Sequence, residues 1–286
     1  MKTSGLIYAI EGHDIYIAER PARISALTPE ASTLAFEAAN NTRPALTIER
    51  GVAIIGLKGV MEKVAFWADE VSTLRVRHEL AEAVNSKQVS SIMLAVDSPG
   101  GTVDGVKELG DAIRTASKAK PLVAQVEGQA ASAALWAVSQ AGSISAHSLD
   151  MVGSIGVRMM LFDESKAFED MGVEPVIIDT GEHKSTGAMG APVTESQRAE
   201  LQRMVDVFFG AFKDAIMQGR RGSGLSREAL NKLADGRMFI GQEAVDNKLI
   251  DRVASSEQTL AELGRIKSNK RQVAEDYQRR VEAGMI

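Results

Sequence analysis

Cysteine is absent from the 286-residue chain, which excludes a disulfide framework and any metal site built from thiolates. Only four histidines are present, and because they are scattered we expect no metal site at all. Basic residues are also in short supply, since 33 Lys and Arg face 38 Asp and Glu and the net charge is −5. A chain with this balance has no basic stripe for nucleic acid, so we predict no nucleic-acid partner.

Long apolar runs are missing as well. No segment approaches the roughly 18 apolar residues that a membrane-spanning helix requires, so we predict no transmembrane segment. The N-terminal stretch is interrupted by Glu11, His13 and Asp14 and lacks the continuous apolar region of a signal peptide. The simplest interpretation is a protein made and kept in the cytoplasm. What the chain does contain is a 44% share of apolar residues, enough for one sizeable core.

The pattern of the sequence changes twice along the chain. Residues 1–47 are mixed in pattern, with one predicted helix start in "LTPEAS", where Thr28 would cap the helix and Pro29 would occupy its first position. From about residue 257 the chain is charged and helical in propensity, with apolar residues too sparse for a core helix. We therefore predict an N-terminal extension (1–47), a main domain (48–256) and a charged helical tail (257–286).

Apolar runs and helical periodicities alternate through the main domain. The predicted strands lie within 51–61, 90–101, 121–128 and 173–181. The predicted helices lie within 69–86, 103–118, 131–141, 164–171, 196–218 and 226–235, and residues 236–253 are predicted to form a turn, a helix and a strand. This alternation predicts an α/β fold in which helices cover a mostly parallel sheet. Ligands of such sheets bind at the carboxyl ends of the strands.

A proline and two glycines follow one of these strands in "DSPGG", residues 97–101. Proline sets the entry of the turn, and glycines present backbone N–H groups with no Cβ in the way. Such a turn can bind an anion or an oxyanion, and it can equally be an ordinary tight turn between a strand and a helix. It is not a nucleotide-binding loop, because the glycine and lysine spacings of those loops are missing.

Ser132 lies in a second candidate turn, within "VEGQAASAALWAVSQAG". Taken alone, small residues at a strand-to-helix turn are more often a packing device than a site. The predicted position is nevertheless the first turn of a helix, where the N–H of Ala133 has no helical partner and negative charge is favoured. A nucleophilic serine needs two donors for its oxyanion, which the N–H groups of Gly101 and Ala133 could supply.

A serine nucleophile also needs a base. None of the four histidines has a recognisable triad context; they are His13, His78, His147 and His183. The stronger candidate is Lys184 in "DTGEHKSTGAMGAP", because a lysine acts as a base when a poorly solvated pocket favours its neutral form, and small apolar residues surround this one. The plain alternative is an ordinary surface lysine.

Several motifs together resemble the signal peptide peptidase A family of serine peptidases, which has the crotonase/Clp-protease-like superfold. In order and spacing they are "GVAIIGLKGVM", "IMLAVDSPGGTVDG", "QVEGQAASAALWAVSQAG", "MVGSIGV", "DTGEHKST" and "GRMFIGQEAVDNKLID", covering roughly residues 50–253. The resemblance implies a Ser-Lys dyad of Ser132 and Lys184, an oxyanion hole of Gly101 and Ala133, protein or peptide substrates, and no metal or organic cofactor. The family often has glycines where this chain has Ala133 and Ala134.

The resemblance also implies a biological setting. Without a predicted transmembrane helix, and with an extension ahead of the first strand, the chain looks most like the phage head-maturation (prohead) peptidases of the family, whose partners are capsid or scaffold proteins. Family members of this length form homo-oligomeric rings in which the lysine can come from a neighbouring protomer. The apolar residues of helix 196–218 exceed what one face needs to bury, which favours an oligomer.

Three alternatives remain open. One is a cytoplasmic signal-peptide-peptidase-like protease of a bacterium. Another is an acyl-CoA enzyme of the crotonase type, although such enzymes typically act through carboxylates. The last is an inactive scaffold protein with the same fold, which the intact Ser132 and Lys184 disfavour.

Overall fold

Parallel strands form the centre of the larger of two sheets in the computed structural model, which describes residues 9–11 and 46–265. These strands are β3 (Val52–Lys58), β6 (Ser91–Ser98), β8 (Leu122–Ala131) and β10 (Met151–Gly153). The antiparallel strands β2 (Thr47–Glu49) and β11 (Met238–Ile240) close its two edges, and β9 (Ser143–Ala146) with β12 (Arg252–Val253) extend it beside β8. The predicted α/β fold with a mostly parallel sheet is confirmed.

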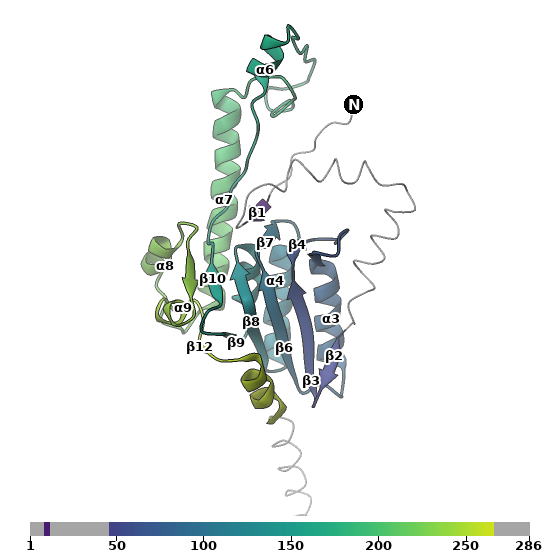
Figure 1. Ribbon diagram of the computed structural model, residues 1–286, viewed down its shortest axis with the longest axis vertical. Helices are drawn as coiled ribbons and strands as arrows, with labels where there is room; N and C mark the ends of the chain where they lie inside the picture. Colours follow the sequence, from purple (N-terminus) through teal and green to yellow (C-terminus); the bar gives the residue numbers. More distant parts are fainter. Residues whose placement is uncertain (1–8, 12–45, 266–286) are drawn as a thin grey trace, which may run out of the picture.

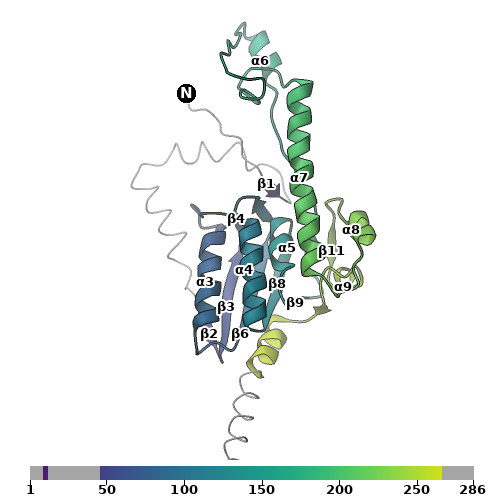
Figure 2. The ribbon, with the colours of Figure 1, turned by 180° about the vertical axis from the view of Figure 1, so that it is seen from behind.

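Three helices cover one face of this sheet, as seen from behind in Figure 2. They are α3 (Thr73–Asn85), α4 (Val106–Ala119) and α5 (Ala133–Val138), and the sequence predicts all three. Side chains from these helices and from the sheet form one continuous core. The strand β6 is buried along almost its whole length, which explains its unbroken apolar sequence.

A smaller sheet lies beyond the ends of these strands (Figure 1). Its order is β1 (Ala9–Glu11), β7 (Gly100–Thr102), β4 (Val60–Glu62) and β5 (Glu70–Ser72). The "DSPGG" motif thus ends β6 and begins β7, so the predicted turn continues directly into a short strand.

We call the two sheets together with α3, α4 and α5 the body. A long helix, α7 (Glu195–Gly219), leads away from the body (Figure 1). It begins with a capping box, in which Thr194 Oγ1 accepts from Gln197 N and the Gln197 side chain accepts from Thr194 N. Residues 157–194, which we call the arm, first run beside α7 and then form the region at its far end, which contains α6 (Ser165–Asp170). The chain then returns to the body through α8 (Arg227–Leu233) and α9 (Gln242–Asp246).

The strand predicted within residues 173–181 is wrong. These residues form no strand, and Val176 and Ile178 are 85% and 94% exposed. The sequence has the apolar, β-branched character of a strand, but no other strand of the described residues lies beside it to pair with its backbone. An extended segment without such a neighbour cannot form the ladder that defines a sheet.

The first part of the predicted tail packs on the other face of the large sheet. Residues 256–265 are helical, and Leu263 is buried against Val52 and Met93. Thr259 Oγ1 donates to the buried Gln125 Oε1 at 2.6 Å. The boundary at residue 257 stays a prediction, as does the extension 1–47, whose predicted helix at Thr28 lies outside the described residues. Among the residues that the structure describes, no helix is both long and apolar enough to cross a bilayer.

Candidate active site

Ser132 connects β8 to α5 and has an unusual backbone. Its φ is 54° and its ψ is −122°, a conformation that non-glycine residues rarely adopt and that costs about 1–3 kcal/mol. Its N–H donates to Gly153 O at 2.9 Å, which continues the pairing of β8 with β10, while its C=O already accepts from Trp136 N in α5. The strain arises because one residue joins a strand directly to a helix.

The Ser132 hydroxyl is buried and has no hydrogen-bond partner. The residue is 1% exposed, and Oγ makes no hydrogen bond within the described part of the chain. A buried polar atom left unpaired costs about 1–3 kcal/mol, so such an atom calls for an explanation. Among the described residues, Ser132 is the one that combines a positive φ outside glycine with a buried side-chain atom that has no partner.

Small residues let α5 approach the sheet on both sides of Ser132. Ala130, Ala131, Ala133 and Ala134 are all buried. The first N–H groups of α5, including that of Ala133, have no acceptor within the helix. The small residues at this turn can therefore serve close packing and a catalytic site at the same time.

The "SPGG" turn lies beside the Ser132 turn. The last residue of β6, Ser98, pairs with Ala130, and α5 packs against β7. Ser98 Oγ holds the turn, donating to Gly59 O at 2.7 Å and accepting from Gly100 N at 3.2 Å. A Cβ at Gly101 would lie 1.9 Å from Met61 O, so only glycine fits there. The structure thus brings together the elements that carry Ser132, Gly101 and Ala133.

Lys184 is on the arm and not beside Ser132. Its neighbour Glu182 accepts a 2.7 Å hydrogen bond from Gln197 Nε2, in the first turn of α7. At the other end, Phe212 of α7 stacks on Trp136 of α5 with ring centroids 5.2 Å apart. Fifteen residues separate Gln197 from Phe212, which at 1.5 Å per residue is about 22 Å of helix. Within one chain the two predicted dyad residues are not brought together.

The histidines provide no substitute base. His13 lies outside the described residues, and His78 is exposed on α3. His147 is exposed and its ring contacts Ser148 Oγ, while His183 lies on the arm beside Lys184. None of these three described histidines bonds to the Ser132 hydroxyl.

Ser154 is a residue that the sequence analysis did not single out. It follows Gly153, the acceptor for Ser132 N, and its own N–H donates to Arg237 O at 2.8 Å. Like Ser132 it is buried and has a positive φ, of 51°. The signal was present in "MVGSIGV", where a serine follows a glycine at the end of a strand, but periodicity does not show that this strand ends next to Ser132.

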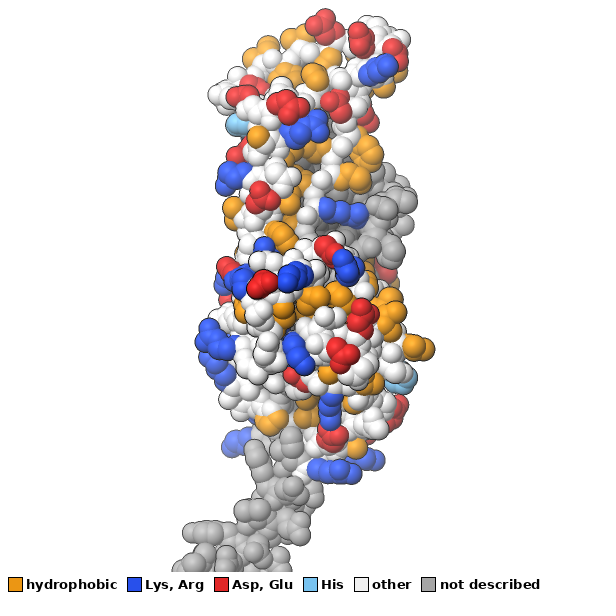
Figure 3. Space-filling model, turned by 90° about the vertical axis from the view of Figure 1, so that its left-hand side faces the viewer, with side chains coloured by type: hydrophobic (Ala, Val, Ile, Leu, Met, Phe, Trp, Pro, Cys, Tyr) orange, Lys and Arg blue, Asp and Glu red, His pale blue; other side chains and the backbone are white. Residues whose placement is uncertain are grey.

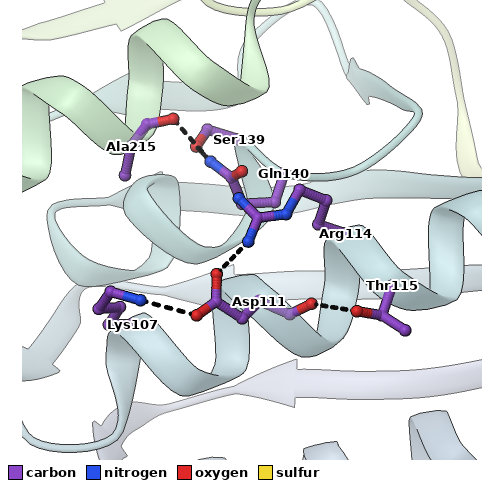
Figure 4. A network of polar contacts seen from close by, with 7 residues as sticks. All are labelled: Lys107, Asp111, Arg114, Thr115, Ser139, Gln140 and Ala215. Carbon is purple, nitrogen blue, oxygen red and sulfur yellow. Dashed lines mark hydrogen bonds and ion pairs between the residues drawn. The ribbon is translucent and has the colours of Figure 1, made fainter.

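Polar contacts lie behind the site, on α4 and at the C-terminal end of α5 (Figure 4). The side-chain amide of Gln140 donates to Ser139 Oγ at 2.9 Å and to Ala215 O of α7 at 2.6 Å. On α4, Asp111 accepts from Lys107 and Arg114, and the hydrogen bond from Lys107 is the main reason that the pKa of Asp111 lies below its usual value. The bond from Gln140 to Ala215 and the Trp136–Phe212 stack connect the α5 segment to α7, whereas the Asp111 contacts lie within α4.

Sequence comparison places the chain among known proteins. The profile of peptidase family S49 matches residues 114–270, more than half of the chain. The chain belongs to this family. The match includes Ser132, Ser154 and Lys184, whereas Gly101 precedes it.

Its relatives come from several kinds of source. A protein assigned as a protease in Methanocaldococcus jannaschii is 33% identical over 175 residues, which are 61% of this chain and 55% of the relative. One from Synechocystis is 28% identical over 62% of both chains. Capsid assembly protease C of Escherichia phage lambda is 29% identical over 62% of this chain and 39% of its own. The likeness therefore supports the family without singling out its phage members, and the chain spans less than two thirds of each of these relatives.

Among solved structures, an enoyl-CoA hydratase/isomerase family member covers 83% of this chain and 84% of its own, with a TM-score of 0.45 and 16% identity.

Proposed function

We propose that the chain is a serine endopeptidase that acts through Ser132 and Lys184. The neutral amine of Lys184 takes the Oγ proton as Oγ attacks the peptide carbonyl carbon, and the N–H groups of Gly101 and Ala133 bind the resulting oxyanion. The C–N bond then breaks while the lysine returns the proton to the leaving amine. Water, deprotonated by the same lysine, hydrolyses the acyl-enzyme ester. No metal or cofactor takes part in these steps.

The observation that carries this proposal is the conformation of Ser132. In a chain of peptidase family S49, the one residue at the β8–α5 turn is strained, buried and has an unpaired hydroxyl next to helix N–H groups. An inactive scaffold protein would gain nothing from keeping this strain, so the alternative of a purely structural role is disfavoured.

The base reaches Ser132 from a second copy of the chain. About 22 Å of α7 separates the arm from the body within one chain. The arm also exposes apolar side chains that a second copy would cover, namely Phe162, Met171, Val176, Ile177, Ile178 and Met189. They interrupt the polar surface near the top of Figure 3. The proposal is therefore a homo-oligomer, in which Ser154 lies next to the incoming amine and can accept a hydrogen bond from it.

Mixing two inactive variants tests the dyad and its origin together. Ser132→Ala and Lys184→Ala should each lower kcat/KM on a fluorogenic peptide by at least about 1,000-fold. Ser148→Ala and Lys166→Ala, which change an exposed serine and another exposed arm lysine, serve as controls and should keep full activity. Co-assembly of the two inactive variants should restore up to roughly a quarter of the wild-type rate, since that share of sites combines an intact serine with an intact lysine from the neighbour.

Two outcomes would contradict the proposal. Full activity of Lys184→Ala would remove the lysine base, and full activity of Ser132→Ala would remove the nucleophile. A mixture that stays inactive, although its subunits are shown by mass to have mixed, would leave the dyad intact but assign it to a single chain.

The finer proposal for the biological role is capsid maturation in a phage or prophage, within the bacterial host cytoplasm and with capsid or scaffold proteins as substrates. The relatives that favour it are capsid assembly protease C of phage lambda and a head-tail preconnector protein of phage P21, which is 26% identical. The relatives in Methanocaldococcus jannaschii and Synechocystis favour a cellular protease instead. Portal and major capsid genes beside the gene for this chain would decide for the first role, and their absence would decide for the second.

A further inference from the structure

The strand β1 is paired with the strand that carries the proposed oxyanion donor. It runs antiparallel to β7, with Ala9 opposite Thr102, Ile10 opposite Gly101 and Glu11 opposite Gly100. These three residues belong to the N-terminal extension, far from β7 in the sequence, and Figure 1 shows β1 at the end of the body from which α7 leads away. Residues of the extension therefore lie alongside Gly101.

Without β1, this side of β7 would be an open edge. The order of the small sheet is β1-β7-β4-β5, so β4 occupies the other side of β7, and β1 is the only strand of the described residues on this one. Gly100 and Gly101 have no side chains to shield it. An open edge of this kind presents main-chain donors and acceptors that bind another extended chain.

We propose that this edge of β7 binds extended polypeptide and that residues 9–11 are its built-in occupant, an intramolecular pseudosubstrate that substrate must displace. The inference rests on the proposed peptidase function. A peptide antiparallel to β7 passes Gly101, and α5, which begins right after Ser132, packs against β7. An extended substrate and β1 therefore require the same main-chain groups of β7, and only one of them can be bound at a time.

The competition is weak enough to be reversible. A three-residue strand contributes few hydrogen bonds, each with a net value of about 1 kcal/mol. Its tether nevertheless gives it an effective concentration in the millimolar range. We expect the pairing to raise the apparent KM for peptide substrates by about three- to tenfold and to leave kcat unchanged, because substrate at saturation displaces the strand.

Disulfide trapping tests the pairing without any need for activity. Since the chain has no cysteine, the pair Ala9→Cys and Thr102→Cys can be introduced in a Ser132→Ala background with no competing thiol. Under mild oxidation this pair, whose Cα atoms are register partners, should crosslink at least about tenfold faster than Glu11→Cys with Thr102→Cys, which is two residues out of register. Equal rates for the two pairs would overturn the proposal.

A second measurement links the pairing to the site. In the active 286-residue chain, Ile10→Pro removes a main-chain donor and disfavours the strand, so KM should fall about three- to tenfold with kcat unchanged. Ser25→Pro, which places a proline elsewhere in the extension, is the control and should leave KM as in the wild type. With Ser132 intact, oxidation of the variant that carries both Ala9→Cys and Thr102→Cys should block hydrolysis, and a reductant should restore it.

The outcomes separate this inference from the peptidase proposal. A crosslinked chain that still hydrolyses peptide at the full rate would disprove the shared edge while confirming the activity. A reductant-treated chain and wild type that are both inactive would disprove the activity, whereas the crosslinking rates would still report on the pairing.

Discussion

The body and the arm of this protein differ in how far they bury the two proposed site residues. In the body, Ser132 lies among buried alanines, on a turn held by β10, α5 and the SPGG segment. On the arm, Lys184 is exposed, as is Ile178 in the apolar segment 173–181, which has no strand beside it among the described residues. The body is complete in one chain, whereas the arm has the composition of a surface that another molecule covers.

This difference bears on how the two halves of the proposed catalytic dyad are stabilised. The strained Ser132 turn is stabilised by the fold of its own chain, so the proposed nucleophile is present in a monomer. The arm keeps Lys184 at a distance from Ser132, so in the proposed mechanism a monomer lacks its base. In the proposed mechanism, assembly is the step that completes the site, and an unassembled chain is an inactive precursor.

The largest difference between body and arm should appear in a matched pair of phenylalanine substitutions. Phe212, in the C-terminal half of α7, is 0% exposed, whereas Phe162 of the arm is 63% exposed. Phe212→Ala should lower the free energy of unfolding by about 3–5 kcal/mol, because it leaves a cavity beside Trp136. Phe162→Ala should change it by less than about 0.5 kcal/mol. Urea unfolding at low protein concentration measures both, and equal losses would mean that the arm is folded as tightly as the body.

A smaller effect on stability is expected at Ser132, where the glycine variant should be more stable than the alanine variant, the reverse of the usual order. Glycine normally destabilises a folded chain relative to alanine, but it tolerates a positive φ that alanine does not. Ser132→Gly should therefore be more stable than Ser132→Ala by about 1 kcal/mol, with both variants inactive. At the exposed Ser148, which has no positive φ, the order should be reversed. Thermal unfolding of the four variants decides the point, and the same order at both positions would show that the turn is not strained.

Much of the body could be predicted from the sequence, because its signals are local. The buried runs of β3, β6 and β8 read directly as parallel strands, and the cap at Thr194 places the start of α7 within one residue of the predicted position. The segment 173–181 has the same kind of signal, but a strand also requires a neighbour, which the rest of the described chain does not provide. In the tail, Leu260 and Leu263 were enough to hold a helix on the sheet although its apolar residues are few.

The site was predictable in its residue types and not in its geometry. The serine, the glycine turn and the lysine were found from motifs, but the φ of Ser132 depends on the pairing of β8 with β10, which joins residues far apart in sequence. The same long-range pairing brings Ser154 next to Ser132, and another sets β1 against β7. The dyad itself stays a prediction, because its two members would meet only through contacts between chains.

The smallest of these effects concerns two aspartates, Asp251 in the body, which bonds to Arg220 at the C-terminal end of α7, and Asp163 on the arm. Burial raises the pKa of Asp251, but hydrogen bonds from Arg220 and from Ile144 N outweigh it and hold that pKa below the usual value. On the arm, hydrogen bonds from Ser165 and from Val193 N lower the pKa of Asp163. A carboxyl with a lowered folded-state pKa stabilises the fold above its unfolded pKa of about 3.9, and this stabilisation is lost as the pH falls through the folded value.

Replacing each aspartate by asparagine separates the two regions. Asp251→Asn should lower the global free energy of unfolding at pH 7, and its difference from the wild type should shrink as the pH falls below about 4. The effect is modest because the carboxylate is 36% exposed and water screens its bond to the buried Arg220. Asp163→Asn should leave global unfolding unchanged and speed hydrogen exchange only in residues 157–194. If both variants instead lowered global stability together, the arm and the body would unfold as one unit, and the arm would be no more adaptable to a second copy than the sheet is.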